Sequence, residues 1–161
     1  MKTPALNFLQ DRKIPFTLYE YECQADHDFG RNAARMLNRP EEQVFKTILL
    51  EDGARRYITC VLPASGLISL KNVARILKVK QVRMCDQHTA QKVTGYVIGG
   101  ISPFGQKKRT ELLLDESAMG FDEILVSAGM RGLSVGIRPG DLSSSLGGIV
   151  CDLLDHGKDK G

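Results

Sequence analysis

Two runs rich in aliphatic and β-branched residues, joined by an Asp-Gly pair, constrain the fold of this chain more than any other feature. The runs cover 44–51 (VFKTILLE) and 55–62 (RRYITCVL), and Asp52-Gly53 lies between them. Asp-Gly favours the positive φ angles of a hairpin turn, and β-rich runs on either side favour antiparallel strands. The sequence therefore predicts an antiparallel pair of strands over these residues.

Helix and strand signals alternate irregularly along the rest of the chain. Thr3 and Pro4 are typical of the cap and first residue of a short helix, which Ile14-Pro15 ends. Apolar spacing predicts further helices at 30–38, 69–78 and 86–93 and after Arg138-Pro139, and further strands from Phe16, from Tyr96 and at 110–114, 123–127 and 133–137, with a last apolar segment near 149–154. This order predicts a single mixed α/β (α+β) domain over 1–161, in which helices flank a curved, largely antiparallel mixed sheet or partial barrel, with a short polar tail at 156–161.

The strand that begins at Phe16 alternates in side-chain character. Phe16 and Leu18 fall on one side, and Thr17, Tyr19 and Tyr21 fall on the other. Because successive side chains of a strand point to opposite faces, the pattern predicts a half-buried strand with its two tyrosines on the less apolar face.

Length and composition exclude several classes of protein. The 161 residues are enough for one soluble domain, and 22 Lys and Arg against 19 Asp and Glu leave a net charge of only +3. No apolar run approaches the roughly 18 residues of a membrane helix, and the first residues lack a secretory signal pattern. The four cysteines are widely separated, with no Cys-x-x-Cys pair that would begin a zinc or redox site. We therefore expect a cytoplasmic protein with no metal, no cofactor and neither a membrane nor DNA as a partner.

Lys46 is the one charged residue in the middle of the first strand run. Strand alternation places it in a row with Val44, Ile48 and Leu50. One explanation is an edge lysine, which blocks pairing with another sheet. The other is a partly desolvated ammonium that donates hydrogen bonds to a ligand carbonyl or phosphate. The pattern alone leaves both explanations open.

A glycine pair follows the predicted strand that begins at Tyr96. The segment is YVIGGISPFG (96–105), in which Gly99-Gly100 allow unusual φ angles and a close backbone approach to a ligand. The N–H groups around such a pair are suited to bind an anion or an oxyanion. The segment has neither the P-loop nor the Rossmann glycine spacing, so it does not support nucleotide binding of those kinds.

Basic residues gather in two places. Five of them share a window without an acidic residue, and three follow the glycine segment directly: Lys71, Arg75, Lys78, Lys80 and Arg83, and Lys107, Lys108 and Arg109. Clusters of this kind are either solvated faces or contacts for a phosphate-bearing substrate such as RNA. The aromatic stacking motif of an RNA-recognition domain is absent.

The usual motifs of a catalytic protein nucleophile or a hydrolytic metal are missing. The chain has no Gly-x-Ser-x-Gly elbow and no His-Glu-x-x-His helix. Cys60 lies in an alternating strand and Cys151 in an apolar segment, where a cysteine acts as a small buried side chain. We assign no catalytic function to His27, His88 or His156.

Three segments together resemble one protein family. They are FKT at 45–47, TGYVIGGISPFGQKKR at 94–109 and VSAGMRGL at 126–133. They resemble the YbaK branch of the aminoacyl-tRNA editing family, the free-standing Cys-tRNA(Pro) deacylases, which are similar to the editing insertion domain of bacterial prolyl-tRNA synthetase. The resemblance covers nearly the whole chain in order, and the second segment is long and specific.

The resemblance implies a trans-editing hydrolase that removes cysteine from tRNA for proline and so maintains translation fidelity. It implies a reaction without a protein nucleophile or a metal, in which the thiol of the substrate attacks its own ester carbonyl, closes a thiolactone and releases the tRNA. It also implies two partners, which are the mischarged tRNA and prolyl-tRNA synthetase in a transient ternary complex.

Single residues receive roles from the same resemblance. Lys46 matches the essential lysine of the family, which grips the terminal adenosine or its phosphate and the ester. The residues implied to bind the substrate are Tyr21, Phe45, Thr47, Gly99, Gly100, Ile101, Ser102, Ser127 and Ser134, and both basic clusters become candidates for contact with the tRNA backbone. Some members carry Asp where this chain has Ser134, so an acidic role does not carry over to this position.

Two other functions remain open from the sequence. One is deacylation of a different mischarged tRNA, such as Ala-tRNA(Pro), because the pocket around Tyr21, Ile101 and Ser134 cannot be sized from the sequence. The other is a non-catalytic module that binds tRNA or an aminoacyl-adenosine end.

Overall fold

In the computed structural model, which describes residues 2–157, the predicted antiparallel pair forms the middle of the larger of two sheets. β2 (Phe45–Glu51) and β3 (Tyr57–Pro63) pair antiparallel along their whole length. Their connection covers 52–56 and is longer than the tight turn that Asp52-Gly53 predicts. Asp52 Oδ1 accepts hydrogen bonds from the N–H groups of Ala54 (2.8 Å) and Arg56 (3.2 Å), so its side chain closes this longer loop.

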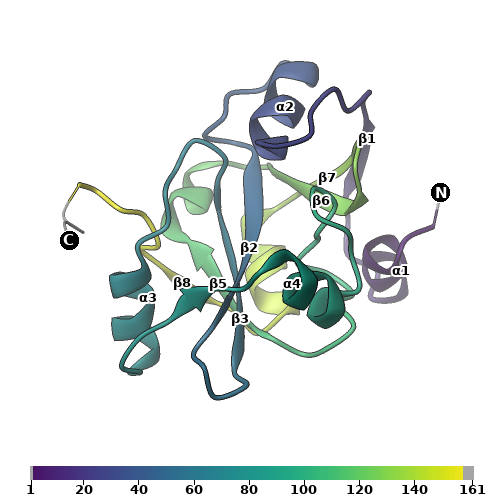
Figure 1. The fold of residues 1–161 in the computed structure, drawn as a ribbon. Helices are drawn as coiled ribbons and strands as arrows, with labels where there is room; N and C mark the ends of the chain where they lie inside the picture. Colours follow the sequence, from purple (N-terminus) through teal and green to yellow (C-terminus); the bar gives the residue numbers. More distant parts are fainter. Residues whose placement is uncertain (1, 158–161) are drawn as a thin grey trace.

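The remaining elements surround this hairpin (Figure 1). The helices are α1 (Pro4–Asp11), α2 (Phe29–Met36), α3 (Leu70–Leu77), α4 (Gln87–Thr94) and α5 (Pro139–Ser145), with a 3-10 helix η1 (Glu116–Gly120). The other strands are β1 (Thr17–Glu20), β4 (Arg83–Met84), β5 (Glu111–Asp115), β6 (Ile124–Met130), β7 (Leu133–Ile137) and β8 (Ile149–Cys151). All five predicted helices are confirmed to within a few residues.

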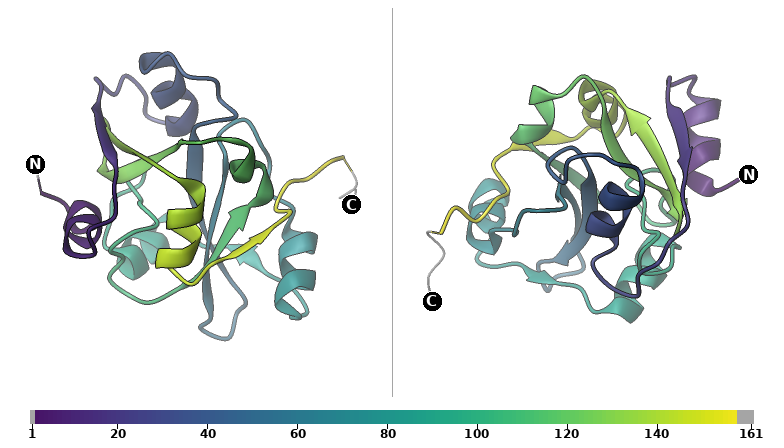
Figure 2. Two further views of the ribbon diagram at one scale, coloured as in Figure 1. Left: turned by 180° about the vertical axis from the view of Figure 1, so that it is seen from behind. Right: turned by 90° about the horizontal axis from the view of Figure 1, so that it is seen from above.

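The strands form two sheets that do not close into a barrel (Figure 2). The larger sheet has the order β4-β2-β3-β5-β8, and the smaller one has the order β1-β7-β6. Only the β3–β5 and β5–β8 pairs are parallel, so the fold is mixed and largely antiparallel, as predicted. A parallel bridge between Val44 and Leu125 joins the sheets at the start of β2.

The larger sheet buries apolar side chains on both faces. On one face Phe45, Val61 and Leu114 pack against α1, α5 and the smaller sheet. On the other face Leu50 and Leu62 pack beneath α3. Two smaller clusters fill the sides, one between α2 and the bridge of the two sheets and one between α4 and β2.

Three of the helices begin with a side-chain cap, and one of these caps, Thr3, is predicted from the sequence. Thr3 Oγ1 accepts from the Leu6 N–H (3.1 Å), Ser69 Oγ from the Asn72 N–H (3.1 Å) and Asp86 Oδ1 from the Thr89 N–H (2.7 Å). Each cap satisfies one of the N–H groups that a helix leaves unpaired at its start. None of the helices within 2–157 is long and apolar enough to cross a membrane.

Two local predictions are wrong. Residues 96–98 form no strand, because the chain turns there into the loop that carries Gly99 and Gly100. In β1, Leu18 is exposed, whereas Tyr19 packs toward α2 and its hydroxyl donates to Glu123 (3.0 Å). The apolar surface against which β1 packs lies on the tyrosine side of the strand. The partly buried ring of Tyr19 therefore needs a partner for its hydroxyl, and the carboxylate of Glu123, which is ion-paired with Arg39, provides it. Residues 158–161 of the predicted polar tail lie outside the described part of the chain.

Candidate active site

A cavity of about 470 Å³ opens along the N-terminal half of β2, close to the bridge between the two sheets. Its walls come from the segment before α2, the start of α2, β2, the region of β4 and α4, the glycine segment and the β6–β7 pair. β3 pairs with one edge of β2 throughout, but β4 covers the other edge only at Leu50 and Glu51. Residues 45–48 have no strand partner on that side, and they line the cavity.

The cavity brings together eight of the ten predicted catalytic and substrate-binding residues. These are Tyr21, Phe45, Lys46, Thr47, Gly99, Ile101, Ser127 and Ser134. The other two, Gly100 and Ser102, do not line it. Ser102 is fully buried, and its hydroxyl accepts from the Phe104 N–H (3.2 Å), so it shapes the loop behind the cavity.

Lys46 carries a half-buried ammonium into the cavity. Its Nζ donates to the Ala64 carbonyl at 3.5 Å, a long bond that leaves its other N–H donors for a ligand. Burial lowers the pKa of the Lys46 ammonium, while the nearby Asp28 raises it and Arg31 lowers it by smaller amounts. A cation that is partly stripped of water interacts strongly with a carbonyl or phosphate oxygen. Among the described residues, 45–48 lie at an unpaired edge of β2, but the Lys46 side chain lines the cavity there, so its position favours ligand binding over the role of an edge lysine.

Thr47 places a buried hydroxyl in the cavity wall. Within residues 2–157, its Oγ1 has no hydrogen-bond partner. Thr59 on the paired strand β3 is different, because its Oγ1 donates to Gln106 (3.1 Å) and lies 2.6 Å from Thr110 Oγ1. An unpaired buried hydroxyl costs about 1–3 kcal/mol. A ligand that supplies the missing bond accounts for the position of Thr47.

The glycine pair is locked against the β6–β7 turn. Gly99 has a φ of +90°, and a Cβ there would lie 2.7 Å from Arg131 Nε and 2.8 Å from the Phe29 ring. A Cβ on Gly100 would lie 2.8 Å from the Met130 Cα. Arg131 stacks over the Phe29 ring at 4.6 Å and donates to the Ile98 carbonyl at 2.9 Å. Both glycines are therefore required for the close approach that holds this segment at the cavity.

Three hydroxyl groups form another part of the cavity wall: Tyr21 directly follows β1, Ser127 lies on β6 and Ser134 lies on β7. Ser127 and Ser134 are directly opposite each other in the β6–β7 pair. Burial raises the pKa of the Tyr21 hydroxyl, and the nearby Cys23 raises it further, so the phenol stays protonated near neutral pH. Ser127 Oγ accepts from the Gly129 N–H at 3.1 Å. This wall supplies neutral donors and acceptors rather than a charged group.

The start of α2 closes one end of the cavity. Gly30 lies so close to β3 that a Cβ would stand 2.9 Å from the Ala64 Cβ. Asp28, the cap residue, has a φ of 52° and makes no capping hydrogen bond through its side chain. The first N–H groups of α2 thus add a partial positive charge beside Lys46.

The thiols of the chain lie elsewhere. None of the four cysteines lines the cavity. Burial raises the pKa of Cys60, and burial with nearby carboxylates raises that of Cys85 to about 12 and that of Cys151 to about 11. These three thiols are thus poor nucleophiles near neutral pH. The part of the chain that is described contains no group of three or more metal-ligating side chains that could hold an ion.

Sequence reasoning missed several residues of the cavity. His27 lies at the rim, exposed and ion-paired with Asp26 at 2.6 Å. Phe29, Gly30, Met84 and Gln87 also line it. No periodicity or motif marks these positions, because they reach the cavity only through the packing of α2 and α4 on β2. Arg131 does not line the cavity but holds Phe29 and Ile98, which do; it lies within the VSAGMRGL segment that carries the family resemblance.

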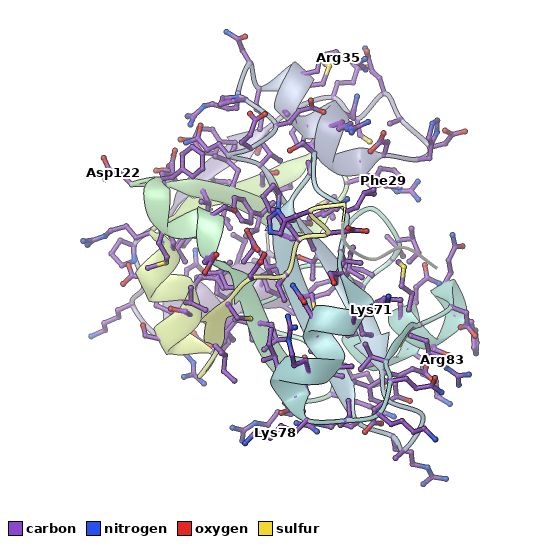
Figure 3. All side chains as sticks on the ribbon, turned by 90° about the vertical axis from the view of Figure 1, so that its left-hand side faces the viewer. Phe29, Arg35, Lys71, Lys78, Arg83 and Asp122 are labelled. Carbon is purple, nitrogen blue, oxygen red and sulfur yellow. The ribbon has the colours of Figure 1, made fainter. Side chains whose placement is uncertain are left out.

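The two predicted basic clusters are separate in space. Lys71 and Arg75 lie on α3, Lys78 ends that helix and Arg83 lies on β4, in the half of the molecule away from Phe29 (Figure 3). Lys80 lies in the connection between α3 and β4. Arg83 is ion-paired with Glu51 (2.7 Å). Lys107, Lys108 and Arg109 line a second hollow near α1.

Two sequence comparisons find related proteins. A family model described as an aminoacyl-tRNA editing domain matches residues 29–144. The proposed Cys-tRNA(Pro)/Cys-tRNA(Cys) deacylase EbsC of Enterococcus faecalis (strain ATCC 700802 / V583) is 31% identical over 152 residues, which cover 94% of this chain and 93% of that protein.

Two solved structures share the fold. The crystal structure of the hypothetical protein APE2540 has a TM-score of 0.86 at 20% identity and covers 95% of this chain and 100% of its own. That of a proposed trans-editing enzyme for prolyl-tRNA synthetase has a TM-score of 0.84 at 19% identity, over 96% of this chain and 99% of its own. The solved structures show the shared fold. The family model and the similarity to EbsC assign the chain to the aminoacyl-tRNA editing family, in its YbaK/EbsC-type branch of trans-editing deacylases.

Proposed function

We propose that this protein deacylates Cys-tRNA(Pro), the tRNA for proline that carries cysteine by mistake. One observation carries the proposal: the cavity combines a partly desolvated ammonium at Lys46, an unpartnered hydroxyl at Thr47 and a fixed glycine segment, while no cysteine lines it. Such a cavity is suited to hold an ester and to stabilise an oxyanion. The nucleophilic sulfur then comes with the substrate.

Editing of this kind has a physical reason. Cysteine and proline are similar in size, and a difference of one methylene in a binding pocket contributes only about 1–3 kcal/mol of discrimination. A synthetase therefore charges some tRNA wrongly, and a second site must remove the error. A reaction that requires a thiol adds chemical discrimination, because proline and alanine have none.

The proposed reaction is intramolecular. The thiolate sulfur of the substrate attacks the carbonyl carbon of its own ester, so that a C–S bond forms and the carbonyl oxygen becomes an oxyanion. The oxyanion then re-forms the carbonyl, and the C–O bond to the terminal ribose breaks. The ribose oxygen takes up a proton from solvent, which balances the proton that the thiol released to solvent on becoming a thiolate, and cysteine thiolactone and free tRNA leave. Because the nucleophile and the ester belong to one molecule, the effective concentration is high before the protein contributes.

The protein's residues orient this reaction and stabilise its charge. The Lys46 ammonium and backbone N–H groups of the Gly99 segment donate to the oxyanion. Thr47 Oγ1 and the hydroxyls of Tyr21, Ser127 and Ser134 hold the amino acid and the ribose. The reaction uses no metal and no cofactor, and it takes place in the cytoplasm, where tRNA is charged.

Two partners complete the proposal. The tRNA body is held by the exposed cations of the basic clusters, so that activity falls as salt rises. Prolyl-tRNA synthetase presents the substrate in a transient ternary complex. The trans-editing description of a protein with the same fold supports this partner.

The direct test is a panel of tRNA(Pro) charged with cysteine, serine, alanine or proline, with and without EDTA. Rapid release is expected from Cys-tRNA(Pro) only, with thiolactone as the first product and no effect of EDTA. Serine replaces the thiol by a hydroxyl, so the Ser-tRNA(Pro) rate should be far lower.

Other outcomes identify another function. Equal rates of release for cysteine and serine would indicate that an activated water, and not the substrate thiol, attacks the ester. Preferential release of alanine would make the protein an Ala-tRNA(Pro) deacylase. Binding of the tRNA end without turnover of any ester would make it a non-catalytic module.

A further inference from the structure

A second hollow, of about 530 Å³, lies between α1, the segment that follows the glycine pair and the end of α5. It shares no lining residue with the candidate active site. Four cations line it, Arg12, Lys107, Lys108 and Arg109, and no carboxylate does. We call this feature the basic groove.

The cations of the basic groove are not neutralised. Among the residues from 2 to 157, none of the four forms an ion pair. Arg39, Arg56 and Arg83 elsewhere are paired with Glu123, Glu111 and Glu51. Unpaired cations that converge on a concave surface concentrate positive potential there. The basic groove is thus suited to a polyanion.

Backbone contacts fix the position of these cations. The N–H groups of Lys107 and Lys108 donate to the carbonyls of Thr94 and Val93, each at 2.9 Å, at the end of α4. Gly105 has a φ of +66°, and a Cβ there would collide with the Pro4 carbonyl at the start of α1. The segment therefore packs directly against α1, which brings Lys107–Arg109 and Arg12 to one hollow.

Arg12 indicates which part of a nucleic acid the basic groove contacts. Its guanidinium lies 4.4 Å from the centre of the Phe8 ring, and Phe104 packs against the same ring at 5.7 Å. The ring is thus occupied and is not a platform for a base. A stacked guanidinium still presents its N–H edge to a phosphate. The groove is built for phosphates rather than for base stacking.

We propose that the basic groove binds the sugar–phosphate backbone of tRNA at a distance from the aminoacylated end. The inference rests on the proposed function for the presence of tRNA. It narrows the contact with the tRNA body to this one hollow, and it adds Arg12 to the cations that make the contact. A contact made through phosphates positions a tRNA without reading its sequence. An acidic protein surface is a poorer occupant, because the one aromatic ring in the groove is already covered.

The test compares two double variants that each remove two positive charges. One is Arg12→Gln/Lys108→Gln in the groove, and the other is Arg35→Gln/Arg55→Gln, two exposed residues that line neither hollow. Binding of uncharged tRNA(Pro) is measured by fluorescence anisotropy over a range of salt concentrations. The groove variant should bind tRNA at least roughly fivefold more weakly. The slope of log Kd plotted against log salt concentration should be shallower by about 2, one for each lost phosphate contact.

Kinetics provide a second readout. The groove variant should raise the KM for full-length Cys-tRNA(Pro) and leave its kcat unchanged, and it should not affect a cysteinylated CCA trinucleotide. If its tRNA affinity and salt slope equal those of the control variant, the proposal is overturned, even if binding to an acidic protein is lost. Failure of the proposed function looks different: the wild type then releases no cysteine, while the groove variant still changes tRNA binding.

Discussion

At the scale of single residues, the half-buried position of the Lys46 charge favours ligand binding and disfavours folding stability. Replacing it by Met should lower kcat/KM for Cys-tRNA(Pro) by about 10²–10³-fold, the usual loss when an oxyanion donor is removed. The same change removes a half-buried charge, so the free energy of unfolding should not fall. Single-turnover deacylation and thermal unfolding measure the two effects, and Lys92→Met, at an exposed position outside the cavity, is the control.

The stability effect of Lys46 should depend on pH with a definite sign. Burial holds the pKa of Lys46 below its ordinary 10.5, so the charged form is disfavoured in the folded state. That penalty is fully present below the lowered pKa and disappears as the pH rises toward 10.5. Lys46→Met should therefore melt higher than wild type near neutral pH, with a gap that closes toward about pH 10. A variant that is less stable at neutral pH would contradict this account of the site.

Thr47 and Thr59 offer a matched pair on neighbouring strands. Thr47→Val removes a hydroxyl without a partner, so it should leave stability unchanged or higher and lower kcat/KM by about tenfold, the value of one hydrogen bond. Thr59→Val deprives Gln106 and Thr110 of a partner and should lower the free energy of unfolding by about 1–3 kcal/mol. Urea unfolding and steady-state kinetics of both variants check this. An unchanged kcat/KM for Thr47→Val would remove Thr47 from the site.

The sequence identified the polar residues of the site more completely than the residues that hold them in place. Lys46 stands out as a charge in an apolar strand, and the family resemblance adds Tyr21, Ser127 and Ser134. Phe29 could not be found in this way, because its role depends on stacking with Arg131, about a hundred residues away in the chain. Contacts of that kind arise from tertiary packing and leave no local pattern.

At the scale of elements, the glycine segment acts as a fixed wall. Gly100→Ala would place a Cβ 2.8 Å from the Met130 backbone, which cannot give way as a side chain can. We expect a loss of about 1–3 kcal/mol in the free energy of unfolding, as for other overpacked sites, together with a lower kcat/KM. Gly120→Ala is the control, because nothing lies within 4 Å of its Cβ. The test compares the denaturant midpoints of unfolding of the two variants. Equal midpoints would show that the glycine segment is free to move.

Local sequence patterns predicted most of the helices and strands. They failed where contacts between residues far apart in the chain determine the structure. The hairpin and the capped helices rest on neighbouring residues, so the sequence was sufficient. The parallel pairing of β5 with β3 and with β8 joins segments far apart in the chain, and no local pattern specifies it. Residues 96–98 are apolar enough for a strand, but the turn at Gly99-Gly100 and the bond from Arg131 to Ile98 hold them as a loop.

At the scale of the whole molecule, the cavity depends on both sheets. Its lining runs from Tyr21 to Ser134 in the sequence and crosses the bridge at Val44 and Leu125. No short fragment contains a complete wall. The site therefore forms only when both sheets are folded and docked together.

One loop forms part of both hollows, and a buried anchor separates its two parts. Ile98, Gly99 and Ile101 line the cavity, whereas Pro103 and Gly105 begin the lining of the basic groove. Between them Phe104 is fully buried, and its carbonyl accepts a hydrogen bond from the Tyr96 hydroxyl. We expect this buried anchor to hold each part of the loop in place when the other part is altered.

Combining Thr47→Val with Arg12→Gln/Lys108→Gln should therefore change the free energy of tRNA binding by the sum of the separate changes, to within about 0.5 kcal/mol. A double-mutant cycle on Cys-tRNA(Pro) measures the difference, and a larger coupling would mean that the loop moves as one body. Independence of this kind lets the two contacts evolve separately: substitutions in the groove can retune affinity for the tRNA body without disturbing the chemistry at Lys46.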